Sequence, residues 1–204
     1  MALILVIDDD DLVSRTLQRA LKMYDYQVMT ANSGIEGLQL ARRHRPDLFI
    51  LDIMMPGVDG YQVCRQIRGD PLLLDGPVLF LTAKAKDEDK IEGFRAGGDD
   101  YLVKPFNMQE LELRVKAILR RVGPEKVEDT TVNEVVVGNV VLDCRTFKVT
   151  TPHQTILLTN VQFDLLYHLM SHADQVFNSQ QLLQDVWDYP RDTGSPELVR
   201  AHIK

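Results

Sequence analysis

The sequence predicts an α/β protein: a doubly wound (βα)5 parallel sheet with strand order 2-1-3-4-5, followed by a smaller α+β domain. Between residue 1 and about residue 121, short apolar runs alternate with amphipathic segments of helical length. These runs hardly alternate with polar residues, which is typical of strands buried on both faces of a sheet. Beyond residue 133, strand-like stretches are followed by helices, which indicates a second domain of different architecture.

The first domain, residues 1–122, contains five predicted strands, at residues 2–7, 27–30, 48–51, 78–81 and 101–103. The segments between them carry apolar side chains at helical spacing, such as Leu17 and Leu21 in the first and Val115 in the last. Asp11 is expected to cap the first helix. Right-handed crossovers between parallel strands then determine the path of the chain through the sheet.

Residues 123–133 form a polar stretch that begins with Gly and Pro and is predicted to be a linker. The second domain, residues 134–204, is expected to begin with strands at residues 135–142, 146–150 and 155–158. Thr159 or Asn160 would cap its first helix, and Ser179 would cap its second. A third helix would start near Pro196, a residue that suits a first helical turn.

The composition excludes several classes of protein. A net charge of -7 with 45% hydrophobic residues is compatible with a packed core, so the chain is not expected to be disordered. The apolar runs are far shorter than the roughly 18 residues of a membrane-spanning helix, and the start lacks the features of a secretory signal. We therefore expect a cytoplasmic protein with no membrane partner. Cys64 and Cys144 stand alone, which favours reduced thiols over a disulfide or a zinc site.

Acidic residues follow two of the predicted strands: Asp8 and Asp9 come after the first, and Asp52 comes after the third. With strand order 2-1-3-4-5, these strands flank the point where the order reverses, so the three carboxylates would converge in one crevice. Close carboxylates repel one another unless a cation joins them, and a set of oxygen ligands open to water suits magnesium. The sequence therefore predicts a magnesium site.

Two further polar residues follow the remaining strands, Thr82 after the fourth and Lys104 after the fifth. Asp52 can attack a phosphoryl group to form an acyl phosphate, while magnesium and Lys104 balance the charge on the phosphoryl oxygens. Thr82 could then hydrogen-bond the new phosphate. Taken singly, each residue has a simpler interpretation as a polar strand end; taken together, they indicate phosphoryl transfer.

Four stretches resemble those of a known family: LVIDD (residues 5–9), PDLFILDIMMPGVDG (46–60), LTA (81–83) and DDYLVKPF (99–106). Over its whole length, the first domain resembles the receiver domain of two-component response regulators. The resemblance implies that Asp52 is the phosphoacceptor for a sensor histidine kinase. It further implies a Mg²⁺ (or Mn²⁺) site formed by Asp8, Asp9, Asp52 and the backbone carbonyl of Met54, a switch pair of Thr82 and Tyr101, Lys104 as phosphate partner, and a cis peptide bond before Pro105.

Met54 lies two residues after the phosphoacceptor, and Lys84 lies two residues after Thr82. In the family that this sequence resembles, these positions influence how water reaches the acyl phosphate. A methionine cannot orient that water by hydrogen bonding. We therefore expect slow hydrolysis of the phosphorylated form.

Charged residues in the fourth and fifth helical units resemble those of the OmpR/PhoB subfamily, whose receivers form homodimers through the fourth helix, fifth strand and fifth helix. Without the resemblance, a solvated charged face is the commoner interpretation. Phosphorylation would draw Thr82 inward and turn Tyr101, which biases this surface toward self-association. The implied pairs between subunits are Lys90 with Glu110, Asp100 with Arg114, and Asp99 with Arg121.

The second domain resembles the winged-helix DNA-binding domain of the same subfamily through residues 158–166, 176–183 and 186–187. In that family the third helix reads DNA, and here it would include Val199, Arg200, His202 and Lys204.

The sequence departs from the winged-helix pattern after Lys204, where family members continue the recognition helix and add a hairpin wing. Residues 124–204 hold 6 Lys and Arg against 11 Asp and Glu, whereas residues 1–123 hold 17 against 19. Such an acidic surface repels phosphate backbones. We expect a truncated form of a longer regulator rather than a natural short protein. The apolar face left uncovered would pack on the first domain, pair with a second copy or be partly disordered.

The leading functional hypothesis is a phosphorylation-controlled transcription regulator that dimerises and binds promoter DNA. It would not be an enzyme, apart from its own phosphorylation and slow dephosphorylation. The alternative is a stand-alone receiver that acts through protein contacts or as a phosphate sink. A magnesium-dependent phosphohydrolase would need a second acid or base beside Asp52, where Ile53 and Met54 stand.

Overall fold

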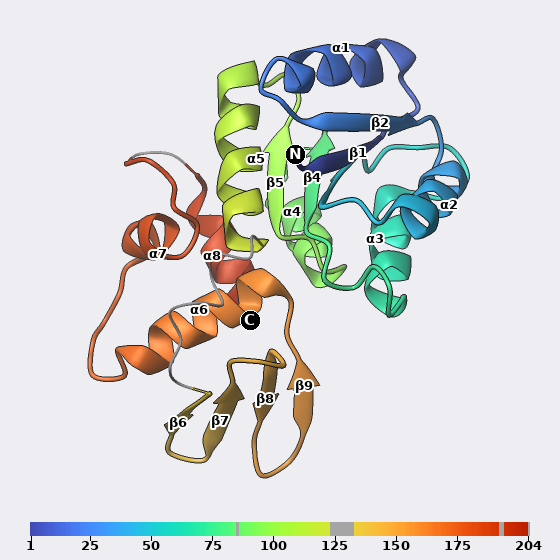
Figure 1. The fold of residues 1–204 in the computed structure, drawn as a ribbon. Helices are drawn as coiled ribbons and strands as arrows, with labels where there is room; N and C mark the ends of the chain where they lie inside the picture. Colours follow the sequence, from blue (N-terminus) through green and yellow to red (C-terminus); the bar gives the residue numbers. More distant parts are fainter. Residues whose placement is uncertain (85, 123–132, 192–193, 204) are drawn as a thin grey trace.

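The computed structural model describes residues 1–84, 86–122, 133–191 and 194–203. Figure 1 shows two parts, an open sheet covered by helices and, beside α5, a group of helices above a small separate sheet. In the described residues, no helix is both long enough and apolar enough to span a membrane.

The first part is a five-stranded parallel sheet of order β2-β1-β3-β4-β5, which confirms the predicted order. Each strand is followed by a helix, as right-handed crossovers require. The elements are β1 Leu3–Ile7, α1 Asp11–Lys22, β2 Gln27–Ala31, α2 Gly34–His44, β3 Leu48–Leu51, α3 Gly60–Gly69, β4 Val78–Thr82, α4 Asp87–Arg95, β5 Asp100–Val103 and α5 Met108–Val122.

The sheet has a packed apolar layer on each face. On one face, alternate strand residues such as Ile4 and Val6 pack with Leu17 of α1 and Val115 of α5. On the other face, residues such as Leu5 and Ile7 pack with the buried side chains of α2, α3 and α4. Burial on both faces explains why the strands are apolar throughout.

Two helix caps lie one residue before their predicted positions. Asp10, not Asp11, caps α1: it has an extended backbone, and its side chain accepts the backbone N–H groups of Leu12 and Val13. Asp11 is the first helical residue. Likewise Asn178, not Ser179, caps its helix. In both cases a neighbouring residue with capping ability has taken the extended conformation that a cap requires.

The second part begins with an antiparallel sheet of order β6-β7-β8-β9, formed by β6 Glu134–Val137, β7 Val140–Asp143, β8 Lys148–Thr150 and β9 Thr155–Leu157. The prediction of one strand over residues 135–142 is wrong, because this segment is a hairpin in which Val137 pairs with Val140. Gly138, at φ 57, makes the two-residue turn.

Three helices follow, α6 Asn160–Ser171, α7 Ser179–Asp185 and α8 Pro196–Ile203. Thr159 caps α6 in a capping box with Gln162, as one of the two predicted alternatives. The linker predicted for residues 123–133 falls almost entirely outside the described residues. The domain boundaries therefore stay a prediction.

The helices of the second part pack on the first, with α8 lying against α4 (Figure 1). The apolar core that covers α2, α3 and α4 continues into this part through residues such as Trp187 and Leu198. At a second point, Asn160 Nδ2 donates a 2.9 Å hydrogen bond to the carbonyl of Asp75. The apolar face of α6–α8 was expected to pack on the first domain, to pair with a second copy or to be partly disordered. In the described residues it packs on the first domain.

Candidate functional site

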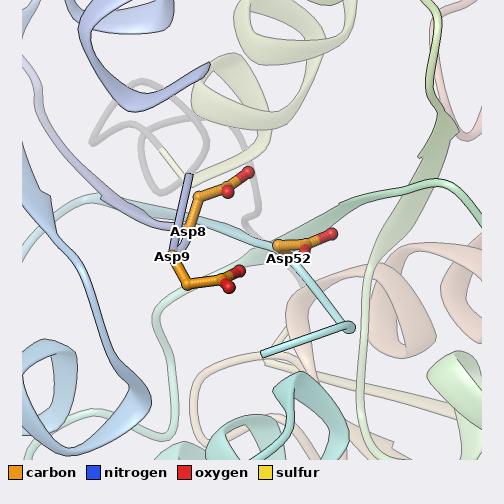
Figure 2. Close-up of side chains that lie close together, drawn as sticks. All are labelled: Asp8, Asp9 and Asp52. Atoms are coloured by element: carbon orange, nitrogen blue, oxygen red, sulfur yellow. The ribbon is translucent and has the colours of Figure 1, made fainter. Parts of the chain in front are cut away.

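Three carboxylates meet at the carboxyl edge of the sheet, as Figure 2 shows. Oxygens of Asp8, Asp9 and Asp52 lie within 4.8 Å of one another. The register explains this arrangement: Ile7 pairs with Leu51, so the residues that follow β1 and β3 leave the sheet side by side. Asp8 and Asp52 are buried, whereas Asp9 is exposed to solvent. The predicted convergence of the three carboxylates is confirmed.

Lys104 supplies positive charge to this group. Its Nζ lies 2.6 Å from Asp8 Oδ2 and 3.5 Å from Asp52 Oδ1. The backbone N–H of Lys104 donates to the carbonyl of Thr82 at 2.8 Å, which extends the β4–β5 pairing and brings the lysine to the same edge. The Lys104–Pro105 peptide bond is cis, as predicted. A single ammonium group beside three carboxylates leaves the site with excess negative charge.

The environment of Asp52 suits both a nucleophile and a metal ligand. Burial raises the pKa of the Asp52 carboxyl; Lys104 opposes this rise, and Asp8 adds to it. Asp52 Oδ1 is buried and accepts no hydrogen bond from any residue in the described ranges. The Lys104 ammonium lies 3.5 Å from this oxygen. Because a buried carboxylate oxygen without a hydrogen bond is costly, the remaining lone pairs favour a further cation. Asp8, Asp9 and Asp52 therefore fit a hard divalent cation, which prefers oxygen ligands.

The loop after β3 folds back beneath Asp52. The N–H groups of Met55 and Gly60 both donate to the carbonyl of Ile53, each at 3.1 Å. A Cβ at position 60 would lie 2.3 Å from the carbonyl oxygen of Asp52, so only glycine allows this close approach. The Met54 side chain is exposed on this loop. The metal-binding role predicted for the Met54 carbonyl stays a prediction.

The predicted switch residues are connected through one loop. Thr82, fully buried at the end of β4, accepts a 3.3 Å hydrogen bond from the backbone N–H of Lys84. Tyr101 on β5 is 6% exposed and donates a 2.9 Å hydrogen bond to the carbonyl of the same Lys84. Thr82 and Tyr101 therefore both contact the backbone of Lys84, and their role as a switch pair stays a prediction.

Comparison with known proteins decides the family. The model of the response regulator receiver domain matches residues 4–116. The chain is a two-component response regulator. The model described as "Transcriptional regulatory protein, C terminal" matches residues 153–204 of the regulator, which is therefore of the OmpR/PhoB type.

Relatives and solved structures agree with this assignment. The "DNA-binding dual master transcriptional regulator RpaA" of Synechocystis is 39% identical over 207 residues, covering 100% of this chain and 84% of the relative. Response regulator MprA of Mycobacterium leprae is 37% identical over 205 residues, covering 98% of this chain and 87% of the relative. The crystal structure of a putative response regulator from Chloroflexus aurantiacus has 45% identity and a TM-score of 0.56, covering 58% of this chain and 98% of that one.

Three of the residues predicted to pair between subunits, Asp100, Glu110 and Arg114, contact one another within one chain. Arg114 Nη1 lies 3.0 Å from both carboxylate oxygens of Asp100, and Arg114 Nη2 lies 2.7 Å from Glu110. Asp100 and Arg114 are buried, at 1% and 6% exposure. The side chain of Lys90, the predicted partner of Glu110, lies outside the described residues.

Asp99 also has its partners inside the receiver. Its Oδ2 lies 2.7 Å from Arg68 Nη2 and accepts the backbone N–H of Val78 at 2.7 Å. The side chain of Arg121, its predicted partner, lies outside the described residues. Asp99 is 2% exposed, so in this arrangement it joins parts of the receiver rather than two subunits.

Of the predicted DNA-contacting residues of α8, Val199 and His202 pack against other side chains, whereas Arg200 is exposed. Val199 is 1% exposed and belongs to the apolar core, and its predicted contact with DNA stays a prediction. The His202 ring lies between those of Phe94 and Trp187, at centroid distances of 5.1 Å and 5.6 Å. Arg200 is exposed and lies 3.0 Å from Glu197. Lys204 lies outside the described residues.

Sequence reasoning missed two residues with central contacts. Arg68 joins the α3–β4 and α4–β5 loops, and Tyr189 contacts the Asp100–Arg114 pair. No local pattern could have identified them, since their partners lie between 6 and 89 positions away in the sequence.

Proposed function

We propose that Asp52 accepts a phosphoryl group from a sensor histidine kinase and that the C-terminal domain converts this event into control of transcription at promoter DNA. The observation that carries the proposal is the buried, open Oδ1 of Asp52 beside Asp8, Asp9 and Lys104. An oxygen of Asp52 forms a bond to phosphorus while the bond from phosphorus to the histidine nitrogen breaks. The nitrogen keeps the bonding electron pair.

Each neighbouring residue has a defined task in this transfer. Bound Mg²⁺ or Mn²⁺, held by Asp8, Asp9, Asp52 and the Met54 carbonyl, supplies positive charge that shields the phosphoryl oxygens. Lys104 neutralises part of the remaining negative charge from its position 3.5 Å from Asp52. The Thr82 hydroxyl is available to donate to the bound phosphoryl group, because its observed hydrogen bond uses only its acceptor capacity.

Output requires a second step. In the phosphorylated state, two copies would pair through α4, β5 and α5, with Lys90–Glu110, Asp100–Arg114 and Asp99–Arg121 as pairs between subunits, each made twice by symmetry. The paired C-terminal domains would then contact promoter DNA through α8. RpaA is named a DNA-binding regulator, which supports this output. Partners of these two kinds would be met in the cytoplasm, which is the location we propose.

The test is phosphorylation by a small-molecule donor. The regulator is incubated with acetyl phosphate and Mg²⁺, and its intact mass is measured with and without excess chelator. We expect a mass gain of one phosphoryl group that needs the metal and that hydroxylamine removes, as it does for acyl phosphates. No mass gain, or a gain that resists hydroxylamine, would contradict the proposal.

A second candidate function is a receiver that acts through protein contacts or as a phosphate sink. The buried position of Val199 favours it, because α8 cannot present this residue to DNA in the observed arrangement. Binding of phosphorylated regulator to promoter-length duplex DNA separates the two functions. Affinity that falls steeply with salt supports transcriptional output, and absence of binding supports the alternative.

The exposed Met54 gives a prediction about phosphate lifetime. An asparagine at this position can orient a water molecule toward the acyl phosphate, which a thioether cannot do. Met54→Asn should therefore shorten the half-life of the phosphorylated protein several-fold, measured by intact mass after removal of the donor. Met23→Asn, which changes an 84% exposed methionine at the end of α1, is the matched control. An unchanged half-life in Met54→Asn would show that Met54 does not limit hydrolysis.

A further inference from the structure

Two histidines and a carboxylate come together where the chain passes from α6 to α7. His168 lies in the last turn of α6, and His172, four positions later, is the C-cap of that helix. Their rings lie side by side, with centroids 4.7 Å apart, as this spacing allows. Asp185, the last residue of α7, places its Oδ2 3.6 Å from Nε2 of His168. The cluster therefore spans two consecutive helices of the second part.

Nε2 of His168 lacks a hydrogen-bond partner. It is buried and makes no hydrogen bond with any residue that the structure describes. Its distance of 3.6 Å from Asp185 is too long for a hydrogen bond, so the two side chains do not satisfy each other directly. This distance is close to the roughly 3.4 Å that separates two ligand atoms bound about 2.1 Å from a tetrahedral zinc ion.

His172 has its lone pair on the nitrogen that a metal would need. Its Nδ1 lies 2.8 Å from the carbonyl oxygen of His168. Because a carbonyl only accepts, Nδ1 carries the proton, and in the neutral ring the lone pair is on Nε2. Histidine ligands commonly donate their other N–H in this way. The side chain of His172 is exposed, so turning Nε2 toward His168 and Asp185 requires no repacking of the core.

An apolar side chain lies against both rings. Phe177, in the loop between α6 and α7, has its ring centroid 4.8 Å from that of His168 and 5.8 Å from that of His172. An apolar neighbour lowers the local dielectric constant, which strengthens the attraction between a bound cation and the carboxylate of Asp185.

We propose that His168, His172 and Asp185 form a binding site for a zinc ion, with the fourth position open to water. Two imidazoles and one carboxylate suit zinc, whereas the all-oxygen site at the edge of the parallel sheet suits magnesium. A bound zinc ion would join α6 to α7. The inference is independent of the proposed function, because it involves no residue of the phosphorylation site.

The test titrates Zn²⁺ into the metal-free full chain without an affinity tag, in excess Mg²⁺ that competes for the carboxylate site. Calorimetry measures the dissociation constant, and NMR of the ring signals shows which of the five histidines bind. His172→Gln and Asp185→Asn each remove one ligand from an exposed position. His153→Gln is the matched control, because His153 is exposed in the turn between β8 and β9.

We expect zinc to shift the ring signals of His168 and His172. The dissociation constant should rise about tenfold or more in His172→Gln and in Asp185→Asn and stay unchanged in His153→Gln. Absence of zinc binding, or equal constants in His172→Gln and the control, overturns the site. A rise in His172→Gln without one in Asp185→Asn overturns the role of Asp185. Phosphorylation has no part in these measurements, so failure of the proposed function leaves their outcome unaffected.

Discussion

Asp52→Asn should abolish phosphorylation of the regulator by acetyl phosphate and Mg²⁺. The amide is uncharged and is not a nucleophile toward phosphorus at neutral pH, whereas the ionised carboxylate is. Intact mass should show no gain in the variant under conditions in which the wild type is modified. Asp25→Asn is a suitable control, because Asp25 is exposed far from the site in the turn after α1.

The same substitution should stabilise the metal-free protein at neutral pH. Burial raises the pKa of Asp52, so its ionised form costs folding free energy above that pKa, and the cost disappears as the pH falls toward the carboxyl's ordinary value. Thermal unfolding in chelator should thus give a higher midpoint for Asp52→Asn at pH 7 and equal midpoints in acid.

In the phosphorylation test, a mass gain that persists in Asp52→Asn would show that another residue accepts the phosphoryl group.

Arg68→Ala should cause a large loss of stability, although Arg68 lies outside the site. Arg68 donates to the carbonyls of Leu74, Gly76 and Gly97 at 2.7–2.9 Å and to Asp99 at 2.7 Å. Truncation would leave Asp99, 2% exposed, as a buried charge without its ionic partner. Loss of one member of a buried pair costs about 3–5 kcal/mol.

Urea unfolding measures this loss directly. Arg65→Ala is the matched control, since Arg65 lies on the same helix but is exposed, and its effect should stay within about 0.5 kcal/mol. Equal unfolding free energies for the two variants would mean that the Arg68 network contributes no more than surface charge.

The candidate site was predictable because sheet topology alone brings its residues together. Asp8 and Asp52 each follow a strand in a parallel sheet whose order places β1 beside β3. Lys104 follows β5 in the same way. Strand ends are visible in a sequence as the point where an apolar run stops, so no tertiary information beyond strand order was required.

Other features could not be assigned so reliably from local pattern. Asp10 and Asp11 are both able to cap a helix, and only the backbone conformation distinguishes them. The hairpin at Gly138 was missed because valines on both sides suggested one continuous strand, although Gly followed by Asn is a known turn signal. The resemblance to the OmpR/PhoB subfamily implied that Asp100 and Arg114 pair between subunits, whereas the structure shows them paired within one chain.

Trp187 is the one tryptophan in the sequence, and its ring is fully buried beside that of His202 on α8. Its fluorescence therefore originates from a single place, directly behind the helix that rests on Phe94. Departure of α8 would admit water to the indole and move its emission to longer wavelength. The regulator thus carries an intrinsic optical probe with which movement of α8 can be followed in solution without a label.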